Sequence, residues 1–91
     1  MQASYTIVAE SHPLERSVTL LLNGKFDEEA LPDLAQTLAQ ARCSSENVLL
    51  DLSEVTLVDR KSVQYFSEQA AMNVKLVNCP IYLRHWIVGK P

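Results

Sequence analysis

The amino-acid sequence predicts a single α/β domain with a four-stranded mixed sheet and about three helices, in the order β-β-α-β-α-β-α. Two observations support this fold class. Short segments with strand-like apolar patterns alternate with longer segments whose apolar residues recur at helical spacing, which is typical of parallel βαβ units. The 91 residues, of which 47% are hydrophobic, are enough for one small domain with its own core, covering residues 1–91.

The chain begins with two predicted strands. Residues 4–9 alternate weakly between polar and apolar side chains, and the segment 11–16, which contains Pro13, predicts a turn. Residues 17–23 then carry apolar side chains at a period of two, which predicts a strand that Gly24 would end. The apolar residues on the inward face of this strand are Val18, Leu20 and Leu22.

A helix is predicted over residues 27–42. Acidic residues gather at its start, Arg42 lies at its end, and Pro32 is acceptable in a first turn, where its missing N–H has no partner. The apolar positions at helical spacing are Leu31, Leu34, Ala35, Leu38 and Ala41. The loop 43–47 leads to residues 48–53, an apolar run expected for a strand that is covered on both faces.

The second half of the chain repeats the alternation. Asp59 would cap a second helix after a strand region that Val55, Leu57 and Val58 close. Residues 74–78 predict a further strand, and residues 80–88, which begin with a proline, predict a third helix. Apolar positions in the two helices are Val63, Phe66 and Ala70, and the pairs Tyr82/Trp86 and Leu83/Ile87, with Gly89 and Pro91 as an expected helix stop.

Charge and hydropathy argue against nucleic-acid and membrane functions. The formal net charge is −3 and the eight Lys and Arg residues are scattered, so no basic surface for nucleic acid is expected. No apolar run approaches the ~20 residues of a membrane span, and the first residues do not resemble a signal peptide. We therefore expect a cytoplasmic protein without direct membrane insertion.

No catalytic centre, metal site or cofactor is expected. The two histidines and two cysteines have no metal-ligand spacing, the two glycines form no phosphate-binding loop, and neither Ser53 nor Ser62 lies in a nucleophile elbow. One alternative is a redox role for Cys79, since a thiol at a helix N-terminus has a lowered pKa. The competing interpretation is a small residue in a tight turn before Pro80.

The start of the second helix raises a question of charge. A helix N-terminus carries about half a positive charge and favours anions, yet Arg60 and Lys61 directly follow the capping residue Asp59. One interpretation is a basic spot that binds an acidic or phosphate-bearing surface. The other is that these flexible side chains reach into water and have no function.

Two stretches resemble the STAS domain, a family shared by anti-sigma factor antagonists and sulfate transporters. They are 24-GKFDEEALPDL-34 and 48-VLLDLSEVTLVDRKSV-63, and 74-VKLVN-78 fits the family's next strand, so that the resemblance covers residues 17–78. Where regulated family members have Asp-Ser-Ser-Gly, this chain has Asp59, Arg60, Lys61 and Ser62. The resemblance places Lys61 at the phosphoserine position, so phosphorylation is not expected there, and Ser62 is left as a weak phosphoacceptor candidate.

The resemblance implies a non-enzymatic regulatory module whose partner is a protein. The first expectation is a partner like the ATP-binding, kinase-like anti-sigma factors, and the alternative is a subunit of an ABC-type lipid transporter that contacts the transporter ATPase. Family members commonly add a strand and a helix after residues 80–88, so we expect residues 74–78 to lie at a sheet edge. That edge would support homodimerisation or docking to a larger protein, with Tyr65 near the contact. The expected partner-binding residues are Asp27, Asp59, Arg60, Lys61, Ser62 and Gln64.

Overall fold

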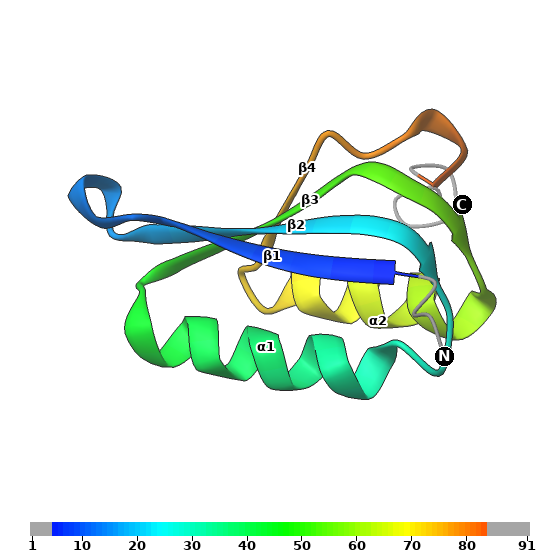
Figure 1. Cartoon of the computed structure of the whole chain (residues 1–91), viewed down its shortest axis with the longest axis horizontal. Coiled ribbons are helices and arrows are strands. Elements are labelled where there is room, and N and C mark those ends of the chain that lie inside the picture. Colours follow the sequence, from blue (N-terminus) through cyan, green and yellow to red (C-terminus); the bar gives the residue numbers. More distant parts are fainter. Residues whose placement is uncertain (1–4, 84–91) are drawn as a thin grey trace.

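The computed structural model describes residues 5–83 and confirms the predicted α/β class and order of elements (Figure 1). The strands are β1 (Tyr5–His12), β2 (Ser17–Phe26), β3 (Asn47–Val58) and β4 (Lys75–Val77). The helices are a short 3-10 turn, η1 (Pro13–Glu15), and the α-helices α1 (Leu31–Ser44) and α2 (Arg60–Ala71). A further helix starts at the end of the described part, where residues 81–83 are helical.

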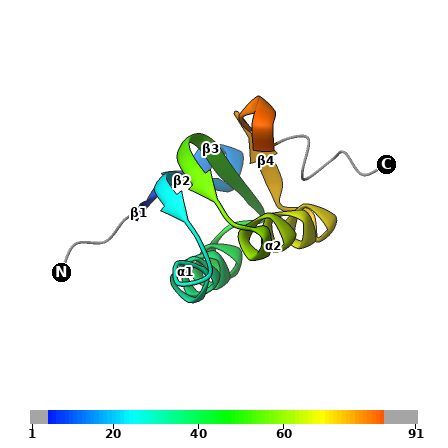
Figure 2. The same cartoon turned by 90° about the vertical axis from the view of Figure 1, so that its right-hand side faces the viewer.

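The four strands form one mixed sheet in the order β1-β2-β3-β4. β1 pairs antiparallel with β2, while β2 with β3 and β3 with β4 are parallel. Both parallel connections step in the same direction across the sheet, so two right-handed crossovers must pass over the same face. Figure 2 shows this result: α1 and α2 lie side by side under one face, and neither covers the other.

The hydrophobic core lies between the sheet and these two helices. The inward face of β2 consists of Val18, Leu20 and Leu22, as predicted, and all three are buried. Phe26, the last residue of β2, and Phe66, in the middle of α2, are fully buried, and the ring centre of Phe26 lies 5.2 Å from that of Tyr5. The remaining buried apolar residues are Ala30, Leu34, Leu38, Ala41, Val48, Leu50, Leu52, Val55, Val63, Val74 and Leu83.

The predicted end of the second strand and the predicted start of the first helix were both wrong. Gly24 does not end its strand: with φ of 99° it stays paired with Tyr5, and β2 continues to Phe26. The first helix begins at Leu31 instead of Asp27. The reason is that Asp27 forms a local turn, in which its carboxylate accepts from the N–H of Glu29 at 3.0 Å, and short polar side chains of this kind favour turns over helix interiors.

The register of β3 changes twice along its length. Leu21 and Asn23 of β2 pair with Asp51 and Glu54, and a second shift occurs between Gly24 and Lys25. Each shift adds one residue to β3, as in a β-bulge, and so reverses the face on which later side chains lie. The buried positions of β3 are therefore Val48, Leu50, Leu52 and then Val55, while Leu57 is 54% exposed.

Asp51, a carboxylate in an otherwise apolar strand, stabilises the first of these shifts. One of its oxygens accepts from the backbone N–H of Ser53 at 2.9 Å, and the other accepts from the side-chain amide of Asn78 at 3.2 Å. Asn78 follows β4 and has a left-handed backbone with φ of 54°. Asp51 thus connects the irregular part of β3 with the exit of β4, which is a structural role.

The C-terminal part of the described chain returns to the core. Leu83 is fully buried, and the hydroxyl of Tyr82 donates to the carbonyl of Val55 at 3.1 Å. β4 lies at an edge of the sheet, as expected. Trp86, Ile87, Gly89 and Pro91, which were expected to complete the last helix, lie outside the described residues. No helix within residues 5–83 is long and apolar enough to cross a membrane.

A pair of identical substitutions tests the placement of the core. Leu20→Ala removes a fully buried side chain and should lower the free energy of unfolding by about 2–5 kcal/mol. Leu14→Ala makes the same change at the tip of the β1–β2 hairpin, where the side chain is 101% exposed, and should change it by less than about 0.5 kcal/mol. Urea denaturation measures both, and equal effects would contradict the described core.

Candidate functional site

The candidate site lies where the parallel strands β2 and β3 end. Their last residues, Phe26 and Val58, are register partners, so the loop 27–30 and the start of α2 leave the sheet side by side. Figure 2 looks onto this edge, with the ends of both strands towards the viewer. In open α/β sheets, binding sites form at the carboxyl ends of strands, because neighbouring loops converge there.

Asp59 joins the two segments through its carboxylate. As predicted, it is the N-cap of α2, and Oδ1 accepts from the backbone N–H of Ser62 at 2.8 Å. The other oxygen, Oδ2, accepts from the backbone N–H of Glu28 at 3.0 Å. One side chain therefore caps the helix and also holds the loop between β2 and α1, a contact that no capping pattern in the sequence indicates.

These two hydrogen bonds keep Asp59 ionised. Partial burial alone would raise the pKa of its carboxyl, but the backbone N–H groups of Ser62 and Glu28 donate to it and favour the charged form. The hydrogen bonds outweigh the burial, so the pKa of Asp59 lies below its ordinary value of 3.8. The carboxylate is charged throughout the neutral range and supplies an anion at the N-terminus of α2.

The cations at the start of α2 are offset by anions that the sequence alone does not place. The ammonium of Lys61 lies 3.1 Å from Oε2 of Glu28, and both side chains are two-thirds exposed. Arg60 is exposed, and it makes no hydrogen bond or ion pair with any residue of the described range. The helix N-terminus therefore has Asp59 and Glu28 nearby, and the electrostatic cost of Arg60 and Lys61 is reduced.

The other expected contact residues divide into two groups. Gln64 is exposed on the first turns of α2, where its amide donates to Glu68 at 3.4 Å. Asp27 is half-buried, bound to the N–H of Glu29 and 3.7 Å from the ammonium of Lys25, so it shapes the loop. Ser62 is fully buried and its hydroxyl makes no hydrogen bond with any residue of the described range, so neither a kinase nor a partner reaches it in this conformation.

We call the exposed group of Arg60, Lys61, Gln64 and Glu28 the charged edge. Glu28 was not among the expected contact residues, although the acidic run after the second strand was a signal for it. Nor was Leu57, the register partner of Lys25 at this end of the sheet, expected to be exposed. An apolar residue at a strand end is expected to be buried, and only the extra residue in β3 turns it outward.

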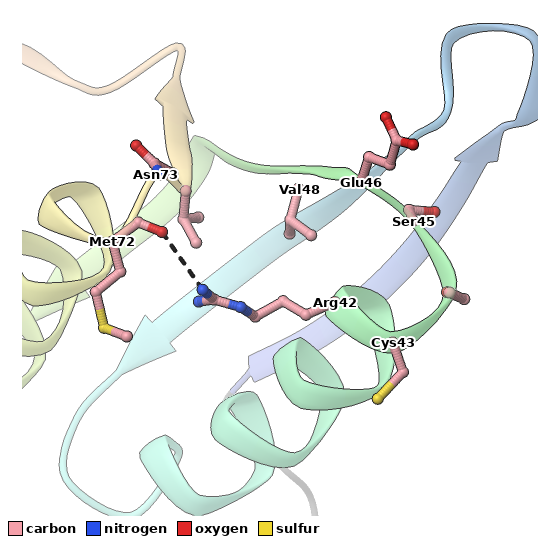
Figure 3. A pocket seen from close by; sticks show the side chains of 9 residues that line it. Arg42, Cys43, Ser45, Glu46, Val48, Met72 and Asn73 are labelled. Carbon is pink, nitrogen blue, oxygen red and sulfur yellow. Dashed lines mark hydrogen bonds between the residues drawn. The ribbon is translucent and has the colours of Figure 1, made fainter.

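A separate hollow of about 490 Å³ lies near the opposite end of the sheet, where α1 and α2 end (Figure 3). The guanidinium of Arg42 extends across it and donates to the carbonyl of Met72 at 3.4 Å. A cation is favourable at the negative end of a helix, so Arg42 ties the end of α1 to the end of α2. Cys43 also lines this hollow, but its side chain points away from the bond between Arg42 and Met72.

The two cysteines lie in different surroundings. Cys43 is exposed, whereas Cys79 is half-buried and packs against the core. Within residues 5–83, no three His, Cys, Asp or Glu side chains are placed to hold a metal ion. The charged edge has charged and amide groups for contact with a polar surface, and the adjacent Ser62 is buried.

Asp59→Ala tests the double role of this carboxylate. Loss of the cap and of the bond to Glu28 should lower the free energy of unfolding at pH 7 by about 1–2 kcal/mol. A carboxyl whose pKa is lowered in the folded state stabilises the fold above its ordinary pKa, and this contribution is lost as the pH falls through the folded value. The difference between wild type and variant should therefore shrink below pH 3.8.

The matched control is Glu54→Ala, which removes an exposed carboxylate on β3. It should change the free energy of unfolding by less than about 0.5 kcal/mol. Urea denaturation between pH 3 and pH 7 compares the variants. A constant difference between wild type and Asp59→Ala over this range would contradict an ionised capping carboxylate.

A scan against protein-family models finds no model that matches this chain. A search of the curated proteins finds no match either.

Proposed function

We propose that this protein is a non-enzymatic regulatory module of the STAS-like type, which binds another protein through the charged edge. The observation that carries the proposal is the double contact of Asp59. It holds the β2–α1 loop against the start of α2 with both oxygens, and so leaves Arg60, Lys61 and Gln64 exposed on a fixed backbone. A surface that is ordered before binding loses less conformational entropy when a partner docks.

The charges of this edge favour a partner with an acidic or phosphate-bearing surface. Arg60 has no ion partner among the described residues, and a guanidinium can bind a carboxylate or phosphate through two parallel hydrogen bonds. Lys61 is held by Glu28 in an exposed pair, which is weak enough for an incoming anion to compete with. The exposed Leu57 at the same end of the sheet adds an apolar contact.

We further propose that phosphorylation does not switch this module at the start of α2. Lys61 stands where the resemblance places the phosphoserine, and the hydroxyl of Ser62 is fully buried. A phosphate on Ser62 would also need space beside the carboxylate of Asp59, which lies 2.8 Å from the Ser62 N–H. Binding would then be controlled by the amount of this protein or by changes in its partner. The proposed place of this interaction is the cytoplasm.

The proposal is tested by comparing Arg60→Glu with the matched variant Arg16→Glu. Both replace an exposed arginine by an anion, but Arg16 lies at the other end of the sheet, beside the hairpin tip. Each tagged protein is used to capture partners from the native host, followed by quantitative mass spectrometry and titration of the purified partner. The proposal predicts that the captured partner is an ATP-binding, kinase-like protein. Wild type and Arg16→Glu should retain this partner, and Arg60→Glu should bind it at least about tenfold more weakly.

Two outcomes would contradict it. One is a kinase-like partner whose affinity for Arg60→Glu equals that for wild type, which would place the contact elsewhere. The other is a transporter ATPase or permease as the protein that depends on Arg60, which would make the chain a transporter subunit instead of a regulator.

A further inference from the structure

Both α1 and α2 lie under one face of the sheet, and neither covers the opposite face (Figure 2). Its side chains alternate along each strand with those of the core, and the pairing registers place them in rows across all four strands. One row consists of Val8, Leu21, Asp51 and Val77. The next consists of Glu10, Thr19, Leu49 and Lys75. We call these two rows the open face.

The charges of the open face are arranged at its opposite edges. Glu10 lies on the edge strand β1, and Lys75 lies in the same row on the other edge strand, β4. Lys75 makes no ion pair with any described residue, and Glu10 has only His12, whose Nε2 lies 3.6 Å away and is charged only when protonated. The two charges are three strands apart, about 14 Å at the usual spacing between strands, so they cannot meet within one chain.

The centre of the open face is apolar. Leu21 and Leu49 are half-buried in the middle of the sheet, and Val8, on the edge strand β1, is 53% exposed. Asp51 is the one charged residue between the edges, and its two oxygens already accept hydrogen bonds from Ser53 and Asn78. It therefore needs no new partner when water is displaced from the face.

This arrangement is complementary to itself. Two copies can be placed with their open faces against each other and related by a two-fold axis that runs parallel to the strands. This axis places β1 of one copy over β4 of the other, and it keeps each row opposite the same row of the other copy. Glu10 of each copy then faces Lys75 of the other, and Val8 faces Val77. Two sheets that pack in this aligned way, with their strands about 30° apart, are a common solution in proteins.

We propose that the open face is a self-association surface, through which two copies of this chain form a symmetric dimer with a Glu10–Lys75 contact at each edge. The two rows extend over four strands at about 4.8 Å and about four residues at about 3.4 Å, which gives roughly 260 Å² for each copy. That area lies below the range of stable interfaces, so the dimer is weak and reversible. It does not use edge pairing through β4, whose three residues offer few hydrogen bonds.

A charge exchange tests the proposal. Glu10→Lys and Lys75→Glu each place like charges opposite one another across the two-fold axis and should raise the dimer dissociation constant about tenfold or more. The double variant Glu10→Lys/Lys75→Glu restores opposite charges and should return it to within about threefold of wild type. Analytical ultracentrifugation at pH 8 and low salt, at protein concentrations up to about 1 mM, measures the constants.

Two matched controls carry the same changes of charge outside the open face. Glu15→Lys and Arg16→Glu alter exposed side chains at the hairpin tip and should leave the dissociation constant unchanged. Wild-type protein that remains monomeric at the highest concentration would overturn the proposal. A double variant that dimerises as weakly as the single variants would also overturn it.

Cross-linking gives a second and direct measurement. A carbodiimide joins a carboxylate to an amine without a spacer, so an amide between Glu10 and Lys75 can form only between two chains. In a mixture of isotopically light and heavy protein, mass spectrometry should find mixed light–heavy peptides that contain both residues. Their absence, at a concentration where wild type is dimeric, would place the dimer contact on another surface and overturn the proposal.

Discussion

The carboxylate of Asp59 is the contact on which the arrangement of the charged edge depends. β2 and β3 are parallel, so their ends meet at one edge of the sheet, but pairing of strands stops at Phe26 and Val58. Beyond that point the loop and the helix need another connection. Asp59 provides it, because one oxygen binds the N–H of Ser62 and the other binds the N–H of Glu28. The position of Glu28 in turn explains how Lys61 is tolerated near a helix N-terminus, since the two side chains form an ion pair.

The one-sided sheet separates two surfaces of different character. Because both crossovers pass over the same face, α1 and α2 bury the inward side chains of β2 and β3, and neither helix covers the other face. The charged edge has exposed cations on a fixed backbone and is suited to a partner of another kind. The open face has apolar residues between one acidic and one basic edge, which suits a second copy. Neither surface shares a residue with the other, so dimerisation and partner binding can occur together.

Much of the fold could be predicted from local patterns. The period of two in Val18, Leu20 and Leu22 identified the inward face of β2, and Asp59 was identified as a helix cap. Features that depend on contacts distant in sequence could not be predicted. The extra residues in β3 that expose Leu57, the bond from Glu28 to Asp59 and the burial of Ser62 all result from strand register and from packing between segments about thirty residues apart. The sequence could therefore indicate the candidate site only at the level of the segment, and the surroundings of Asp27 and Ser62 needed the structure.

The most direct test of this account is a titration of the Asp59 carboxyl group by NMR, observed together with the backbone amides of Glu28 and Ser62. The account predicts a pKa below the ordinary value of 3.8, and amide shifts of both residues that follow the same titration, because both donate to that carboxylate. A pKa at or above 3.8, or a response from Ser62 without one from Glu28, would show that Asp59 caps the helix without holding the neighbouring loop.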